Sequence, residues 1–189
     1  MVLLAAILTD NILLTNFLGM CSFLAVSGRM QTALGMGAAV TFVMTFTTGI
    51  NHVLYHAVLV PLGLEYLTLI VFIAVIAGFV QLAEMVIERL SPALHQRLGV
   101  FLPLITVNCA ILGGSLFMVL RRYDLLSSLC FGFGGGLGYA LAIVAMAGAR
   151  LRLRHADVPK PLQGLAISLI VTALMAMAFM GFAGIVNVQ

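Results

Sequence analysis

Six apolar segments, each long enough to cross a lipid bilayer, divide this sequence, and nearly all the charge lies between them. A membrane-spanning helix needs about 20 apolar residues. Only 8% of the 189 residues are charged, whereas a soluble domain carries about 25%. Lipid must therefore be the main solvent, and we expect a single all-α polytopic membrane domain over residues 1–189. The predicted transmembrane helices are 2–26, 31–58, 66–88, 99–120, 125–149 and 162–186.

The basic residues predict how these helices are oriented. Lys and Arg accumulate in cytoplasmic loops. With the N-terminus outside, seven of the nine basic residues fall on the cytoplasmic side, and only Arg121 and Arg122 fall on the other. This bias favours a multi-pass protein with both termini outside. The net charge of +3 is spread over loops, so nothing predicts a nucleic-acid partner.

Two of the apolar segments are interrupted in the same way. The stretch LLTNFLGMCSFLAVS at 13–27 places Asn16 and Gly19 just before Cys21, and LPLITVNCAILGG at 102–114 places Pro103 and Asn108 before Cys109. These residues predict breaks in helices 1 and 4. Non-helical backbone inside a membrane is tolerated only where it is buried in protein or lines a cavity.

The position of the two interruptions suggests an internal repeat. Three predicted helices precede residue 92 and three follow it, so half-repeats of about 1–92 and 93–189 would cross the membrane in opposite directions. ALGMGAAVTFVM at 33–44 also resembles CFGFGGGLGYALAIVAM at 130–146. Matching interrupted helices in a 3+3 inverted repeat point to a site near the middle of the bilayer. Cys21 and Cys109 would then meet there.

Two explanations remain open for this pair of cysteines. A free cysteine often acts only as a small buried hydrophobe, and we assign that role to Cys130. Alternatively, Cys21 and Cys109 are metal ligands. A [2Fe–2S] cluster takes four cysteines, so a second chain would have to bring two more.

Other polar features are less specific. Glu84 and Asp10 lie within apolar segments, where an acidic residue is a candidate for ion or proton transfer; Glu84 is also close enough to Arg89 to form a helix-end pair. His52 and His56 share a helix face, and we expect an interfacial, non-metal role for both. FGFGGGLG at 131–138 lacks the Lys and Ser or Thr of a phosphate loop, so its glycines predict close helix packing.

Four stretches carry a resemblance to a known family. FLGMCSFLAVS, FLPLITVNCAILGG, VQLAEMVIERLSPAL at 80–94 and ADVPKPLQG at 156–164 resemble the A subunit of the Rnf electron-transport complex and its close relative, the E subunit of the Na⁺-translocating NADH:quinone reductase. The resemblance implies a bacterial cytoplasmic membrane protein with both termini periplasmic. It also implies a homologous six-helix E-type partner, further subunits of the complex, and Cys21 and Cys109 as two of the four ligands of one shared [2Fe–2S] cluster.

The expected function is therefore that of an electron-relay subunit in an ion-translocating ferredoxin:NAD⁺ oxidoreductase, and the alternative is the corresponding quinone-reductase subunit. We predict no catalytic residues, because no nucleotide, flavin or quinone site is visible in the sequence. The translocated ion would be Na⁺ or H⁺. A rival from another class is a small inverted-repeat transporter that binds an ion or solute directly at the interrupted helices.

Overall fold

The computed structural model describes residues 3, 5–90, 102–154, 156, 159 and 162–181. Every regular element over these ranges is helical. Within these described ranges, four helices are long and apolar enough to cross a membrane, at Met30–Leu62, Glu65–Val86, Pro103–Leu120 and Leu125–Leu153, and a shorter apolar helix covers Leu165–Met180. The all-helical membrane class is confirmed. The six-helix 3+3 repeat stays a prediction, and its boundary near residue 92 lies outside the described residues.

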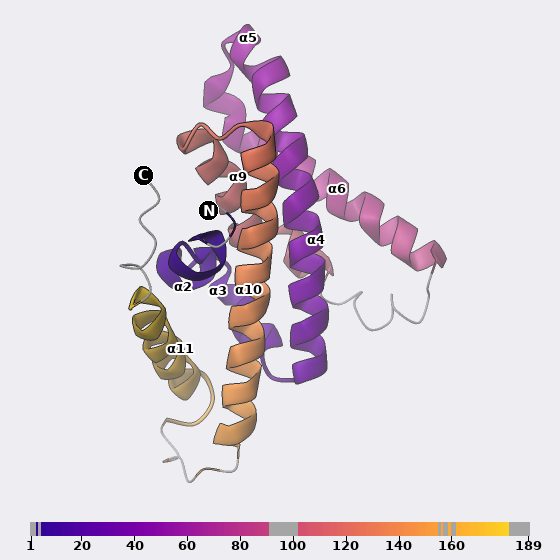
Figure 1. The fold of residues 1–189 in the computed structure, drawn as a ribbon. Coiled ribbons are helices and arrows are strands. Elements are labelled where there is room, and N and C mark those ends of the chain that lie inside the picture. The colour runs from indigo at the N-terminus through magenta and orange to yellow at the C-terminus, as the bar shows by residue number, and fades with distance from the viewer. Residues whose placement is uncertain are drawn as a thin grey trace.

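The two longest helices form the centre of the fold. α4 (Met30–Leu54) and α10 (Leu125–Leu153) run side by side along the long axis of the molecule (Figure 1). They are antiparallel, because Gly37 near the start of α4 faces Ala140 and Gly49 near its end faces Leu129. α4 continues through η2 (Tyr55–Leu59) and α5 (Val60–Leu62).

The glycines of α10 allow the backbones of two neighbouring segments to approach this helix closely, one on each side. On one side, a Cβ added to Gly136 would lie 2.5 Å from Thr41 Cα of α4, so these two backbones are in direct contact. On the other side, Gly134 and Gly138 face the N-terminal segment rather than α4, and a Cβ on Gly138 would lie 3.0 Å from Asn11 Nδ2. The predicted role in close packing is confirmed, with the glycines divided between two neighbours.

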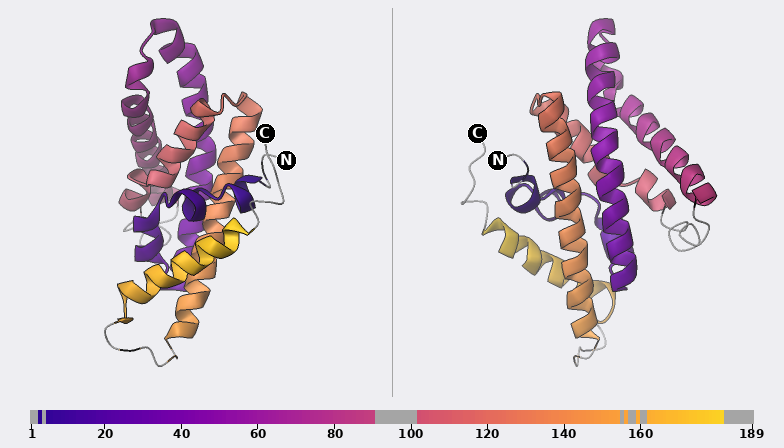
Figure 2. Two further views of the ribbon diagram at one scale, coloured as in Figure 1. Left: turned by 90° about the vertical axis from the view of Figure 1, so that its left-hand side faces the viewer. Right: turned by 45° about the vertical axis from the view of Figure 1, so that its right-hand side comes forward.

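Both segments that were expected to be interrupted are interrupted. The first consists of η1 (Ala5–Thr9), α2 (Ile12–Asn16) and α3 (Met20–Val26). The second consists of α8 (Leu102–Thr106) and α9 (Cys109–Leu120). α2 and α3 lie across the middle of α10 instead of along it (Figure 2). The N-terminal segment is consequently a chain of short pieces that pack on α10.

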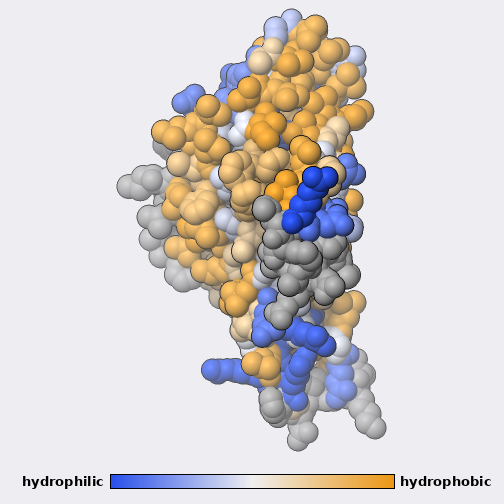
Figure 3. Space-filling view, turned by 90° about the vertical axis from the view of Figure 1, so that its right-hand side faces the viewer, coloured by the Kyte–Doolittle hydropathy of each residue, from blue (hydrophilic) through white to orange (hydrophobic). Residues whose placement is uncertain are grey.

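Two outer helices diverge from this centre. α6 (Thr68–Leu90), preceded by η3 (Glu65–Leu67), packs on α4, α8 and α9, and α11 (Leu165–Met180) packs on α2 and α10. They leave the α4–α10 pair on opposite sides (Figures 1 and 2). Apolar residues cover most of the face in Figure 3, and hydrophilic residues gather toward its lower end. This pattern is the one expected for a protein in lipid.

The contact between α4 and α10 gives the first prediction. Gly136→Ala should lower the free energy of unfolding by about 1–3 kcal/mol, because the new methyl group would overlap the backbone at Thr41. The matched control on the same helix is Gly148→Ala, whose Cβ would meet only Met30 Cε at 3.9 Å. Denaturant unfolding followed by circular dichroism measures both. Equal stability of the two variants would contradict the packing described here.

Candidate functional site

Cys21 and Cys109 both lie at the beginning of a helix that follows a break. Cys21 is the second residue of α3, after the N-cap Gly19, and Cys109 is the first residue of α9, after the N-cap Asn108. The amino end of a helix carries a partial positive charge that stabilises an anion such as a thiolate. The two cysteines therefore have the same local setting, as their sequence surroundings predict.

The two helices leave their breaks in opposite directions. The end of α3 is near the carboxyl end of α10, because Arg150 donates to the Leu24 carbonyl at 3.0 Å. α9 instead ends at Arg121, from which a short turn leads into the amino end of α10. The starts of α3 and α9 thus lie between the two ends of α10, and the two helices lead away from each other toward opposite ends of it.

The two breaks are in contact. A Cβ added to Gly19 would lie 2.9 Å from Asn108 Oδ1 and 3.1 Å from Ala110 Cβ, the residues on either side of Cys109. Gly19 also has a φ of +84°, which a side chain rarely adopts. Glycine is therefore required here both for the backbone turn and for the close approach. The tertiary structure brings together the two segments that the sequence singled out.

Polar side chains that the sequence analysis missed hold the first break in place. Ser22 is fully buried and bonds the Tyr139 hydroxyl of α10 at 2.8 Å and donates to the Gly19 carbonyl at 2.9 Å. Asn11 is also fully buried; its Nδ2 donates to the Gly138 carbonyl at 2.9 Å and its Oδ1 accepts from the backbone N–H of Leu13. The sequence signal for these supports was the occurrence of polar residues within otherwise apolar segments.

The thiols of Cys21 and Cys109 are exposed on this chain. Large apolar neighbours at both breaks are exposed too, with Phe17 at 53% and Val107 at 70%. Neither of these two cysteines is therefore buried within this chain itself, whereas Cys130 on α10 is half-buried. A thiol on the outer face of the chain is available to a second molecule.

The arrangement fits half of an iron–sulfur site. Across the described ranges, no three His, Cys, Asp or Glu side chains are grouped so that they could hold a metal ion. At the two breaks, the described residues provide only the thiols of Cys21 and Cys109 as candidate ligands. Asn108 Oδ1 accepts from the Ala110 N–H at 3.0 Å, and the Asn108 side chain also interacts with the Tyr139 hydroxyl.

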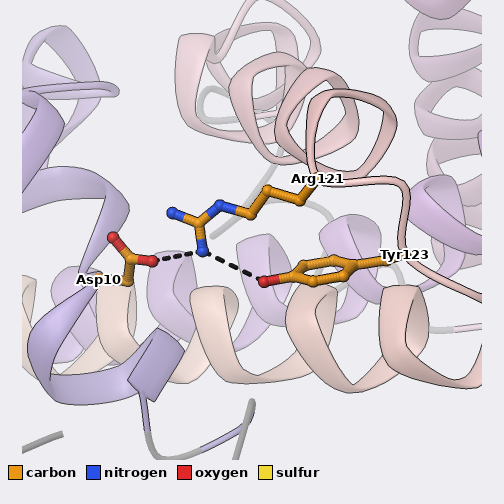
Figure 4. A network of polar contacts seen from close by, with 3 residues as sticks. All are labelled: Asp10, Arg121 and Tyr123. Atoms are coloured by element: carbon orange, nitrogen blue, oxygen red, sulfur yellow. Dashed lines mark hydrogen bonds and ion pairs between the residues drawn. The ribbon is translucent and has the colours of Figure 1, made fainter. Parts of the chain in front are cut away.

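Asp10 forms an ion pair at the outer end of the N-terminal segment. Its carboxylate contacts the Arg121 guanidinium, which also donates to the Tyr123 hydroxyl at 3.2 Å (Figure 4). The hydrogen bond with Asp10 raises the pKa of Arg121 above its usual value. The pair joins the N-terminal segment to the turn between α9 and α10. A role of Asp10 in ion transfer stays a prediction.

The remaining polar candidates lie elsewhere. Glu84 is half-buried on α6 and forms no ion pair with any described residue, so the expected pairing with Arg89 is not observed; its role in ion transfer stays a prediction. His52 Nε2 donates to the Tyr123 carbonyl at 3.0 Å, and His56 Nδ1 donates to the His52 carbonyl at 3.1 Å. His52 thus bonds the turn after α9, and His56 bonds a backbone carbonyl one turn earlier in its own helix.

Comparison with known proteins identifies relatives over the full length. A family described as "Rnf-Nqr subunit, membrane protein" matches residues 1–186. The chain is 50% identical over 186 residues to the A subunit of the ion-translocating oxidoreductase complex of Syntrophotalea carbinolica, covering 98% of this chain and 96% of the relative. It is 49% identical to the A subunit of the Na⁺-translocating ferredoxin:NAD⁺ oxidoreductase complex of Acetobacterium woodii, covering 97% and 95%. It is 50% identical to the E subunit of the Na⁺-translocating NADH-quinone reductase of Nitrosomonas europaea, covering 96% and 95%.

The contact between the two breaks gives the second prediction. Gly19→Ala should destabilise the protein by about 1 kcal/mol or more, because alanine disfavours a left-handed φ and its Cβ would crowd Asn108. The maleimide reactivity of both Cys21 and Cys109 should change, as measured by mass spectrometry of labelled peptides. Gly28→Ala is the control, since a Cβ there meets nothing within 4 Å. Reactivity at Cys109 equal to that of the control would show that the breaks do not depend on each other.

Proposed function

The chain belongs to the Rnf-Nqr family of membrane subunits, and from that membership we propose that it is an electron-relay subunit of an ion-translocating ferredoxin:NAD⁺ oxidoreductase complex. The proposal rests on one observation. Cys21 and Cys109 are both exposed, and the two helix starts that carry them are in contact. The names of the relatives from Syntrophotalea and Acetobacterium support the type of complex. The chain acts as part of a larger assembly, and we assign no catalytic residue to it.

Cys21 and Cys109 are proposed to hold one half of a [2Fe–2S] cluster. Such a cluster takes four thiolates, and the described residues offer only this pair at the breaks. Because both thiols face outward, a homologous E-type subunit can contribute the other two from its own surface. When bound, the cluster would supply a one-electron carrier within the membrane.

The surrounding residues position the two thiols. Gly19 lets the backbone of the first break approach Asn108, and Ser22 fixes the start of α3 to Tyr139. Asn108 caps α9 through its Oδ1, and its side chain also interacts with Tyr139. Hydrogen bonds around the ligands of a metal site typically orient them and tune the metal. In this chain those bonds come mainly from α10 and from the break itself.

A 3+3 inverted repeat in the bacterial inner membrane, with both termini periplasmic, is the topology we propose for this function. Three features support it: the matching breaks before α3 and α9, the opposite directions of these two helices, and the positions of α6 and α11 on opposite sides of the antiparallel α4–α10 pair. In such a repeat, residues of the first and fourth helices meet near the middle of the membrane.

The alternative within the family is the equivalent component of the Na⁺-translocating NADH:quinone reductase. The Nitrosomonas relative with that name is as similar to this chain as the ferredoxin:NAD⁺ relative from Acetobacterium, at 50% and 49% identity. The proposed half-site is the same in both cases. We assign the chain to the ferredoxin type on the resemblance of VPLGLEYLTLIVFIAVIA, at 60–77, with Na⁺ or H⁺ as the ion.

The third prediction tests the ligands. In the intact complex, Cys21→Ser and Cys109→Ser should each abolish the iron–sulfur EPR signal of this site on reduction, lower the iron content and block electron transfer, because a cluster rarely survives the loss of a thiolate. Cys130→Ser is the matched control and should leave all three near normal. The chain purified alone should hold no stable cluster, and the signal should return with its partner.

The opposite outcome would be equally clear. If the cysteines only filled space, each Ser substitution would cost about 1–3 kcal/mol of stability without singling out a pair. Equal, mild effects at Cys21, Cys109 and Cys130 would therefore refute the ligand assignment. A complex that stays colourless and free of this EPR signal would favour the small-transporter function instead.

The fourth prediction tests the topology. Reporter fusions after Arg29 and after Arg154 should be cytoplasmic, and fusions near Gly63 and after Gln189 should be periplasmic. Alkaline phosphatase is active only on the periplasmic side, and green fluorescent protein is fluorescent only on the cytoplasmic side. Each position is therefore tested with both reporters, which should give opposite results. A cytoplasmic C-terminus would contradict the six-helix inverted repeat.

A further inference from the structure

A single buried hydroxyl group lies between the two breaks. Tyr139 is at the middle of α10, is 1% exposed, and has its hydroxyl oxygen 2.8 Å from Ser22 Oγ. Ser22 directly follows Cys21 in the chain. The Asn108 side chain interacts with the same hydroxyl, and Asn108 directly precedes Cys109. One oxygen atom of α10 is therefore in contact with the neighbour of each thiol-bearing residue.

The directions of these hydrogen bonds follow from the number of hydrogens. Ser22 Oγ donates to the Gly19 carbonyl at 2.9 Å, and a hydroxyl has only one hydrogen. The Tyr139 O–H must therefore donate to Ser22 Oγ. Because this hydrogen is used, the interaction between Asn108 and the Tyr139 oxygen has to come from the amide donor Nδ2, while Asn108 Oδ1 accepts from the Ala110 N–H. The bonds thus run in one direction, from the second break to the first.

Close packing holds the members of this chain of bonds together. Ser22, Asn108 and Tyr139 are all almost fully buried. A Cβ added to Gly19 would lie 2.9 Å from Asn108 Oδ1 and 3.2 Å from Tyr139 Cε2, so the amide and the ring lie against the same point of the backbone. A buried polar group that loses its partner is costly. A movement of either break would therefore break a bond of the Tyr139 hydroxyl.

This tyrosine differs from an ordinary core residue in what its hydroxyl contacts. A buried tyrosine hydroxyl usually finds one hydrogen-bond partner. Here the partners are two side chains from two different breaks, and Tyr139 is also close enough to Cys21 for an electrostatic interaction. Groups that hydrogen-bond around the ligands of a metal site orient those ligands and tune the metal. A single group in that position would act on both thiols together.

We propose that Tyr139 is a positioning residue that couples the two half-sites, because its hydroxyl fixes Cys21 and Cys109 relative to each other and tunes the group that they hold. The coupling between the two thiols follows from the contacts within this chain. The effect on the bound group rests on the proposed cluster. A change at one break should consequently alter the thiol at the other break, and this transmission should require the hydroxyl.

The first measurement needs no cluster. Iron is removed from the intact complex with a chelator, and the rates at which maleimide labels Cys21 and Cys109 are measured by mass spectrometry of the labelled peptides. Tyr139→Phe removes only the hydroxyl and should change both rates roughly fivefold, the factor expected from one hydrogen bond. Ser22→Ala removes the same bond from its other end. It should change the rate at Cys109, although Ser22 lies in the break that carries Cys21.

Two control variants separate this role from a general loosening of the fold. Tyr123→Phe removes a hydroxyl that bonds Arg121 in the turn before α10, and both labelling rates should stay at the wild-type value. Asn11→Ala removes a buried bond to the Gly138 carbonyl, so it weakens the attachment of the N-terminal segment to α10 but leaves the Tyr139 hydroxyl in place. Its labelling rate at Cys109 should remain within about twofold of wild type.

The rate at Cys109 decides the proposal. A rate that neither Tyr139→Phe nor Ser22→Ala changes would overturn it, and so would an equal change in Asn11→Ala. Should Tyr139→Phe fail to assemble, Ser22→Ala alone gives the same decision, because it removes the same bond through a smaller change. At Cys21, the double variant should show no larger effect than Tyr139→Phe, since both substitutions remove one shared bond.

The second measurement uses the cluster. In a redox titration of the intact complex followed by EPR, Tyr139→Phe should keep its iron but shift the midpoint potential by roughly 60 mV, which is a tenfold change in the equilibrium of a one-electron couple. Tyr123→Phe should leave the potential unchanged. Retained iron with an unshifted potential would refute the tuning role. Absence of iron from the wild-type complex would instead refute the proposed function, and the labelling rates would still decide whether Tyr139 couples the thiols.

Discussion

A peptide group released by a break in a membrane helix has no water to bond, so it must find its partner within the protein. The N-terminal segment of this chain is broken twice, and α10 supplies most of the contacts that make those breaks possible. The Gly138 carbonyl accepts from Asn11, and the Tyr139 hydroxyl bonds Ser22. The interrupted N-terminal segment therefore depends on one continuous helix, α10.

That dependence explains why α10 is so rich in glycine. The helix has to approach α4 closely on one side, where Gly136 meets the backbone at Thr41, and to receive the N-terminal segment on the other, where Gly138 meets Asn11. Larger side chains on either face would hold the partner away. Glycine costs helix stability in water, but here the tertiary contacts it permits compensate for that loss.

The same contacts determine where the thiols lie. α3 is held at both ends by α10, through Ser22 and Tyr139 near its start and through Arg150 and the Leu24 carbonyl near its end. Cys21 lies on the opposite, exposed side of this anchored helix, and Cys109 is exposed at the start of α9. Buried bonds on one face thus leave the two thiols exposed on the other, as the proposed site shared between two subunits would need.

The amino-acid sequence by itself determined the membrane class, the helical architecture, the two breaks and the cysteines beside them, because apolar length and helix-breaking residues act locally. It did not reveal Ser22, Tyr139 and Asn11 as the supports of the first break, since their partners are more than 100 residues away. It drew attention to Asp10 as a candidate for ion transfer, but it did not reveal the ion-pair partner of Asp10, Arg121 in a distant turn. Whether Cys21 and Cys109 are buried or exposed was decided by the tertiary structure alone, because the side of a short helix that faces outward depends on what packs against its other side.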